Sequence, residues 1–256
     1  MKTISNSEKS IYNLELQKLA KLLKTSKYLV AFTGAGISTA SGLSDYRGED
    51  GVWTRQRKGM SQRSALPFHK AKPTNAHKVL KKLLDQKILR FLISQNIDNL
   101  HRRSGIPESH LAEIHGNYNY MRCSHCDKRF TLRELSISNK IQTLTKPVVL
   151  DKTKKLVCSC NGLIIPTFVS FGSPILKNEL DNAYINAERS DIFMAIGTTM
   201  AVEPASLLPK RAIHKGAKLI IINNGPTSYD KKAYIIFKGD INQIIPDLWK
   251  KVKKIK

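Results

Sequence analysis

No part of the 256-residue sequence is long and apolar enough to cross a lipid bilayer. A membrane-spanning helix needs about 20 consecutive apolar residues, and a secretory signal peptide needs an uninterrupted apolar segment near the N-terminus. Leucines in the N-terminal segment are instead interleaved with lysines, which is typical of an amphipathic helix over residues 10–26. We therefore expect a soluble, intracellular protein, cytoplasmic or nuclear, with no membrane partner.

Acidic residues are scarce, with 20 Asp and Glu against 43 Lys and Arg, so the net charge is +23. Residues 55–90 contain eleven basic residues and one acid, Asp85, and a second basic cluster of five lysines ends the chain. Such segments suit contact with a polyanion such as nucleic acid or chromatin. The alternative is solvated surface charge, because an Ile-, Asn- and Lys-rich chain can reflect genomic base composition.

Cysteines number only four, and they fall in two close pairs, Cys123 with Cys126 and Cys158 with Cys160. Without a secretion signal, this spacing favours a structural zinc ion bound by four thiolates over disulfides, with free or redox-active thiols as the alternative. His125, inside the first pair, is a conceivable substitute ligand. A closed four-thiolate site has no open position for catalysis. We expect it to stabilise a small module over residues 117–162.

A glycine-rich turn, T-G-A-G-I-S-T, follows an apolar segment at residues 28–33 that is typical of a buried strand. Glycines let a backbone approach a pyrophosphate, and Ser38 could cap a helix whose N-terminus faces the phosphates. A purely structural tight turn is the alternative. An acid, an aromatic and a base follow the turn at Asp45, Tyr46 and Arg47, a group that suits a polar ligand with an aromatic ring.

Apolar segments with strand and helix periodicity alternate along the rest of the chain. Strands are expected at residues 28–33, 89–94, 167–171, 191–196 and 218–222, with helices at 10–26, after Pro73-Thr74, at 178–189 and around 205–214, and a loop at 48–53. This alternation predicts an α/β fold, a doubly wound, mostly parallel Rossmann-like sheet. The large domain would comprise residues 1–116 and 163–256, interrupted by the small zinc-binding module.

Small polar residues follow several of these strands, and His115 follows the segment from Leu111 to Ile114. Gln95, Asn96 and Asp98 come directly after the strand at 89–94. Because ligands of open α/β sheets bind outside the carboxyl ends of the strands, these residues predict one long cleft along a single edge. Alternatively, Asn96 and Asp98 are simple turn formers, and His115 is an ordinary core or surface residue.

The order of these motifs resembles the sirtuin (Sir2) family of NAD-dependent protein lysine deacylases. The motifs are GAGISTASGLSDYRG, SQNIDNLH, IHGN, the paired cysteines, FVSFG, IGTTMAVEPASLLP and IINN, and they span residues 28–241. In its first half, the chain is most similar to the class IV branch. The fold that the resemblance implies, a doubly wound domain carrying a zinc-binding small domain, agrees with the one predicted from the alternation.

The resemblance also implies roles for individual residues. The implied NAD-binding set is Gly34, Ala35, Gly36, Ser38, Thr39, Asp45, Tyr46, Arg47, Trp53, Gln95, Asn96, Ile97, Asp98, Gly197, Thr198, Thr199, Asn223, Gly225 and Ile241. The implied catalytic residues are His115 and Asn96, and the implied substrate-binding residues are Phe168, Val169, Ser170, Phe171 and Gly172. The last five would pair with the backbone of an acylated protein substrate as an added strand.

The implied chemistry removes an acyl group from lysine and yields nicotinamide and O-acyl-ADP-ribose. His115 would act as general base, which suits an imidazole because its pKa lies near working pH. Ile165, Thr167 and Ser173 stand where the family has Arg, Asp and Glu, and Ser44 and Tyr46 replace the usual Pro and Phe. No Tyr-x-x-Arg pair, which suits acidic acyl groups, follows Asp45, so we expect a neutral acyl group such as acetyl.

Other functions remain open at this point. An ADP-ribosyltransferase or NAD glycohydrolase would use the same ligand, but neither requires a peptide-binding strand. A dehydrogenase is disfavoured because the turn has no third glycine and no acid ends the second strand. A non-enzymatic chromatin or nucleic-acid binder, regulated by NAD, would use the basic segments instead.

Overall fold

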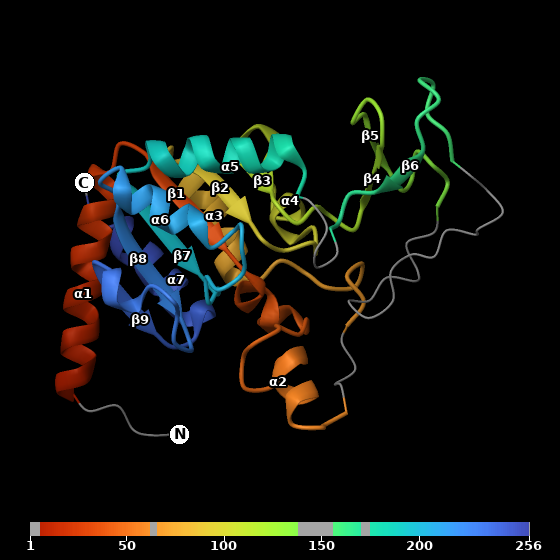
Figure 1. Ribbon diagram of the computed structural model, residues 1–256. Coiled ribbons are helices and arrows are strands. Elements are labelled where there is room, and N and C mark those ends of the chain that lie inside the picture. The colour runs from red at the N-terminus through yellow and green to blue at the C-terminus, as the bar shows by residue number, and fades with distance from the viewer. Residues whose placement is uncertain (1–5, 62–65, 138–155, 170–174, 256) are drawn as a thin grey trace.

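The computed structural model describes residues 6–61, 66–137, 156–169 and 175–255 (Figure 1). Its larger sheet contains six strands in the order β3-β2-β1-β7-β8-β9, and every adjacent pair is parallel. The strands are β1 (Leu29–Thr33), β2 (Leu89–Ser94), β3 (Leu111–Glu113), β7 (Ile192–Ile196), β8 (Lys218–Asn223) and β9 (Ile235–Lys238). The predicted parallel α/β sheet is therefore confirmed.

Helices cover both faces of this sheet (Figure 1). The helices α1 (Asn6–Thr25), α3 (Asn75–Asp85) and α7 (Ile241–Val252) bury one core, and α5 (Lys177–Arg189) and α6 (Leu207–His214) bury the other. Strand β1 contributes to both cores, because Leu29 and Ala31 face the first and Val30 and Phe32 the second. Such two-sided burial explains why the central strands read as continuous apolar segments.

A second, antiparallel sheet of three strands lies to one side of the large sheet (Figure 1). It contains β4 (Tyr120–Cys123), β5 (Arg129–Thr131) and β6 (Ile164–Pro166), in the order β5-β4-β6. The buried core of this part of the chain is small and comprises Met121, Cys123, Leu132, Cys158 and Ile164. The sheet runs to Pro166, four residues beyond the end expected for the zinc-binding module.

Three local expectations were wrong. Ser38 does not cap a helix: it lies inside the 3₁₀ helix η1 (Ala35–Ser41), which begins after Gly34. A short helix, α2 (Val52–Arg57), begins within the expected loop at residues 48–53. The strand expected at residues 167–171 is absent from residues 167–169, because β6 ends at Pro166, where its antiparallel pairing with β4 ends; residues 170 and 171 lie outside the described residues.

The remaining short elements are α4 (Leu100–Arg103) and the 3₁₀ helices η2 (Glu108–His110) and η4 (Asp230–Lys232). The start of α3 was correctly predicted at Thr74, whose hydroxyl accepts from the backbone N–H of His77 while the His77 side chain accepts from the backbone N–H of Thr74. This reciprocal cap satisfies two donors that a helix start leaves unpaired. Within the described residues, no helix has the length and apolar character needed to cross a membrane.

Candidate active site

Three strands end side by side in the middle of the large sheet. Thr33, the last residue of β1, is in register with Ser94 of β2 and with Ile196 of β7. The chain proceeds from β1 toward β3 on one side and from β7 toward β9 on the other, so the strand order reverses between β1 and β7. Doubly wound sheets bind ligands at such a reversal.

The glycine turn after β1 packs directly against the turn after β7. The backbone N–H of Gly34 donates to the Ile196 carbonyl, and that of Gly36 donates to the Gly197 carbonyl, both over 3.0 Å. A Cβ on Gly34 would lie 2.7 Å from the Gly197 oxygen, and one on Gly36 would lie 2.8 Å from the Gly197 Cα. Close packing of two strand ends therefore already requires these glycines, and it brings Thr198 and Thr199 beside the turn.

Ser38, Asn96 and Asp98 form a buried polar cluster below this turn. The Ser38 hydroxyl donates to Asp98 Oδ2 over 2.6 Å, and Asn96 Nδ2 donates to Ser38 Oγ and to the Gly34 carbonyl, each over 3.2 Å. Burial raises the pKa of Asp98, and the hydrogen bonds from Ser38 and from the Leu100 backbone oppose that shift. Residues 58 to 60 positions apart are thus held in one fixed arrangement at this edge of the sheet.

Gln95 bridges the two halves of the sheet. Its Nε2 donates to Thr198 Oγ1 over 2.8 Å and to the Thr33 carbonyl over 3.3 Å. The Thr198 hydroxyl also accepts from the Met200 backbone N–H. The end of β2 and the end of β7 are therefore joined by side chains as well as by the sheet between them.

Residues within the segment from Asp45 to Trp53 contact one another beside these strand ends. Arg47 places its guanidinium 4.5 Å from the centre of the Trp53 ring and donates to Thr199 Oγ1 over 3.4 Å. The rings of Tyr46 and Trp53 are 5.1 Å apart, and Asp45 Oδ1 accepts from the Gly48 backbone N–H. The predicted acid, aromatic and base thus contact the Gly197–Thr199 turn through Arg47.

His115 follows β3 and is half-buried at the same edge. Its Nδ1 lies 2.8 Å from the carbonyl oxygen of Gln95. Because a carbonyl only accepts, Nδ1 carries the proton and Nε2 is the basic nitrogen of the neutral ring. Burial lowers the pKa of His115, and the bond to Gln95 opposes this shift in part. The imidazole is therefore neutral, with one basic nitrogen, at neutral pH.

The peptide-binding segment predicted by resemblance begins beside His115. The backbone N–H of Val169 donates to the His115 carbonyl over 3.1 Å, and Phe168 is half-buried next to it. Ser170, Phe171 and Gly172 lie outside the described residues. The Thr167 side chain, which replaces an expected Asp, is buried, and its hydroxyl lies 2.7 Å from the Asn117 carbonyl. Thr167 therefore fastens the segment to the chain after His115 and does not face the cleft.

The remaining predicted residues lie along the same edge. Asn223 ends β8 and donates from Nδ2 to the Gly225 carbonyl over 2.9 Å, while Ile241 begins α7. Ala35 and Thr39 belong to η1, and the Ile97 carbonyl accepts from the Tyr118 backbone N–H. The structure thus brings the residues that follow β1, β2, β7 and β8 to the edge where His115 follows β3, whereas Gly225 is exposed.

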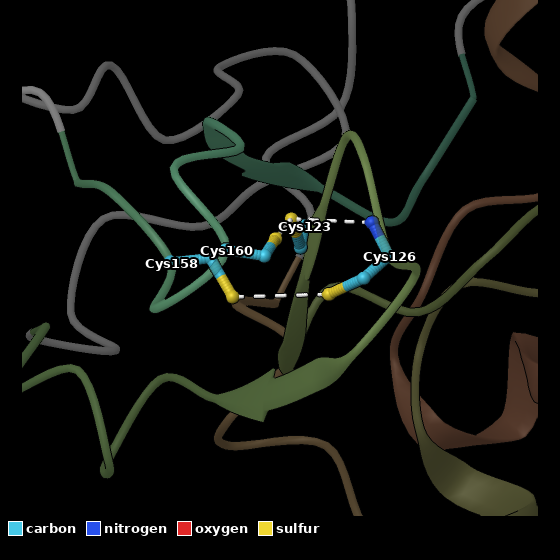
Figure 2. Close-up of side chains that lie close together, drawn as sticks. All are labelled: Cys123, Cys126, Cys158 and Cys160. Carbon is cyan, nitrogen blue, oxygen red and sulfur yellow. Dashed lines mark hydrogen bonds between the residues drawn. The ribbon is translucent and has the colours of Figure 1, made fainter.

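All four cysteine sulfur atoms meet between the two short cysteine motifs (Figure 2). They lie within 4.8 Å of one another, with 3.4 Å between the sulfurs of Cys123 and Cys160 and 3.8 Å between those of Cys126 and Cys158. A tetrahedron of Zn–S bonds has sulfur–sulfur edges of about 3.8 Å. The cluster therefore fits a zinc ion bound by four thiolates, and His125 is not part of it.

Two buried histidines behind the glycine turn received no role from the sequence. His101 Nε2 lies 2.8 Å from Thr33 Oγ1, and the ring of His77 packs on that of His101 with 4.7 Å between centroids. Burial lowers the pKa of His101 to about 3 and places that of His77 well below its usual value. Both rings are neutral supports of the strand end. The one available signal was the position of His101 in the SQNIDNLH motif.

A reversal point with glycine turns, a buried polar cluster, a neutral histidine and a four-cysteine module together define a Rossmann-like, nucleotide-binding protein with a zinc-binding insert. The model of the Sir2 family matches residues 59–204, more than half of the chain. An NAD-dependent protein deacetylase of Thermodesulfovibrio yellowstonii is 37% identical over 96% of this chain and 98% of its own length. The chain belongs to the Sir2 family.

Other relatives differ in length. The NAD-dependent protein deacetylase SRT1 of Arabidopsis thaliana is 36% identical over 90% of this chain, but the chain spans about half of that protein (48%). A solved structure described as addressing the mechanism and regulation of Sir2 enzymes is 30% identical, covers 95% of this chain and 100% of its own, and has a TM-score of 0.73. A Sir2 enzyme bound to a propionylated peptide is 28% identical, with a TM-score of 0.68, over 92% of this chain and 98% of its own.

Proposed function

We propose that the protein removes acyl groups from lysine side chains of proteins in an NAD-dependent reaction. The observation that carries this proposal is the position of His115, a neutral base whose Nδ1 is held by Gln95 at the end of β2 and whose carbonyl is held by Val169. His115 thus lies between a strand end suited to a nucleotide and a segment suited to a peptide. This position fits a reaction between NAD and an acylated peptide. Nucleotide hydrolysis alone would not need the peptide segment.

The residues at the strand ends fit NAD chemically. Glycine turns leave room for a pyrophosphate, and the amides and carboxylate of Gln95, Asn96 and Asp98 match the hydroxyl and carboxamide groups of NAD. When bound, NAD supplies the ribose carbon that takes the acyl oxygen as nicotinamide leaves. We assign binding of the pyrophosphate to the turn after β1, and of the adenosine end to the turn after β7 together with Asn223, Gly225 and Ile241.

His115 would act through Nε2, which is unprotonated at neutral pH because Nδ1 holds the ring proton against the Gln95 carbonyl. Phe168 and the residues after it would hold the peptide backbone as an added strand. The absence of a Tyr-x-x-Arg pair after Asp45 supports a neutral acyl group. The peptides bound to solved Sir2 enzymes include acetylated and propionylated ones.

The test is mass spectrometry of an acetylated lysine peptide after incubation with NAD. We expect a loss of about 42 Da from the peptide, and a decrease of about 10²- to 10⁴-fold in rate for His115→Ala, the usual contribution of a general base. A succinylated peptide, run alongside, should react more slowly. ADP-ribose release with an unchanged peptide would instead identify an NAD glycohydrolase, and a peptide gaining ADP-ribose would identify a transferase.

We also propose two units for the chain, a Rossmann-like domain formed by residues 1–116 and 163–256 and a zinc-binding module around 117–162. Pairing of β6 with β4 supports extending the module to Pro166. Limited proteolysis with and without zinc tests this division, since cleavage confined to the module in the metal-free protein is expected.

A polyanion such as DNA is a second partner that we propose, because the two basic segments come together in space. Helix α3, from the first segment, packs beside α7, which leads into the second. Lys78, Lys82, Lys253 and Lys254 on and after these helices are exposed. Binding to duplex DNA should fall steeply with salt, and Lys78→Gln with Lys82→Gln should weaken it more than Lys215→Gln, after α6 on the other face. Absence of binding near physiological salt would exclude this partner.

A further inference from the structure

Five charged side chains form an ion-pair network between the small sheet and β3, the strand that precedes His115. The members are Arg102 of α4, Glu108 of η2, Glu113 of β3, Arg129 of β5 and Glu179 of α5. Arg102 Nε lies 2.7 Å from Glu113 Oε2, and Arg102 Nη1 lies 3.4 Å from Glu108 Oε2. Arg129 Nη1 lies 2.6 Å from Glu108 Oε1, and Arg129 Nη2 contacts Glu179 Oε1.

The network closes on itself through the backbone. Glu179 Oε2 accepts from the backbone N–H of Glu113 over 2.7 Å, so every member is connected to two others. Arg129 is the one member that belongs to the small sheet, and it contacts two acids of the large unit. The position of β5 relative to β3 is therefore restrained by two carboxylates around one guanidinium.

A second connection leads from the network to the peptide segment. Glu113 Oε1 accepts from Asn117 Nδ2 over 2.6 Å, and the Asn117 backbone N–H donates to Thr167 Oγ1 over 3.1 Å. The Thr167 carbonyl lies so close to Gly116 that a Cβ there would be 2.1 Å from it. Both chain segments that lead into and out of the small sheet are thus anchored next to His115.

Burial differs across the network and indicates what each part contributes. The Glu113 and Arg102 side chains are 4% and 13% exposed, whereas Glu108 is 63% exposed. Exposed ion pairs add little stability, but buried ones with a fixed geometry favour one arrangement over others. Although burial alone would raise the pKa of Glu108, its hydrogen bond to Arg102 and the charge of Arg129 hold that pKa below its usual value.

We propose that Arg129 is a positioning residue, which, through Glu108 and Glu179, sets the zinc-binding module against β3, the strand that precedes His115, so that Phe168 and Val169 are placed for the acyl-lysine substrate. This role rests on the proposed deacylase function. A module held in one position presents its substrate segment without an ordering cost when the peptide binds. Loss of that restraint reduces peptide affinity and leaves the chemistry at His115 intact.

The experiment compares Arg129→Gln with Arg122→Gln. Arg122 is the register partner of Arg129 on β4 and pairs with Asp127 over 2.8 Å, inside the module. For Arg129→Gln we expect the KM for an acetylated peptide to rise about fivefold to tenfold, with kcat within about twofold, as coupling between two units commonly produces. Arg122→Gln should match the wild type, and Arg129→Lys should recover part of the loss.

Two readouts do not depend on catalysis. Zinc content of one ion per chain shows that each variant keeps a folded module. Hydrogen exchange at residues 111–113 should be faster in Arg129→Gln only, because Glu179 is then freed from Arg129 and holds the Glu113 amide less firmly. Equal exchange and equal KM in both variants would overturn the proposal. A wild-type protein without deacylation would refute the proposed function, and the exchange data would still decide the role of Arg129.

Discussion

The large sheet and the small sheet each have one cluster of functional side chains, a polar cluster in the first and four cysteines in the second. The two clusters differ in what holds their side chains in place. The polar cluster of Ser38, Asn96 and Asp98 lies beyond the ends of β1 and β2, strands whose two faces are buried in two extensive hydrophobic cores. The cysteine cluster lies in a core of five buried residues, two of which are the cysteines Cys123 and Cys158. A core of that size does not stabilise a fold by itself. Packing therefore orders the first cluster, and the metal that the second can bind must order the second.

Removing zinc should have the largest effect, because it acts on the unit with the weaker core. Structural zinc contributes about 10–16 kcal/mol to the folding of small zinc domains. For Cys126→Ser, or after treatment with a chelator, we expect the amides of β4 and β5 to lose protection from hydrogen exchange while β1 and β7 keep theirs. Peptide deacylation should be lost as well. Protected β4 and β5 amides in metal-free protein would show that packing alone orders the module.

Gly197→Ala should destabilise the large unit by about 2–4 kcal/mol. Gly197 has φ of +63°, and an added Cβ would lie 2.5 Å from the Ile37 backbone nitrogen. Gly216→Ala is the control, since its φ is +94° but no atom lies within 4 Å of the added Cβ. Urea unfolding should show a loss of about 1 kcal/mol for the control. Equal losses would mean that backbone conformation, and not the contact between the two turns, requires Gly197.

A smaller effect is expected from acid, and it concerns only the large unit. The pKa of His101 is about 3 in the folded protein and about 6.5 in an unfolded chain. Between these values the unfolded chain takes up a proton that the folded protein does not, so stability falls as pH decreases below about 6.5. His101→Gln should reduce this slope by at most about 1.4 kcal/mol per pH unit. An unchanged slope in His101→Gln would contradict a neutral buried imidazole.

The large unit was more predictable from sequence than the small one. Apolar segments such as residues 29–33 predict buried parallel strands, and Thr74 predicts the start of α3. Both predictions succeed because each pattern involves only residues close together in the sequence. In the small sheet, β6 lies at Ile164–Pro166, and the sequence instead predicted a strand from residue 167. The sequence could not predict this sheet, because three short strands have little periodicity and their pairing depends on distant partners. Contacts such as Arg129 with Glu179, fifty positions apart, leave no local signal at all.

Among the candidate site residues, the position of those that follow strands was predictable, because a sheet edge gathers such residues regardless of side-chain detail. Thr167 shows where such reasoning ends. It stands where the family has Asp, but its hydroxyl donates to a backbone carbonyl, which a carboxylate does not do. Only the folded position reveals that this residue holds two chain segments together.

Gln95 has one property that follows from its two contacts. Its side-chain amide bonds to Thr198, where the phosphate or adenosine end of a nucleotide is proposed to bind, and its backbone carbonyl fixes the proton on His115. A ligand that competes with Thr198 for the Gln95 side-chain amide therefore acts on the same residue that orients the His115 ring. Nucleotide binding at the Thr198 turn and the orientation of the His115 ring are therefore coupled through the conformation of Gln95.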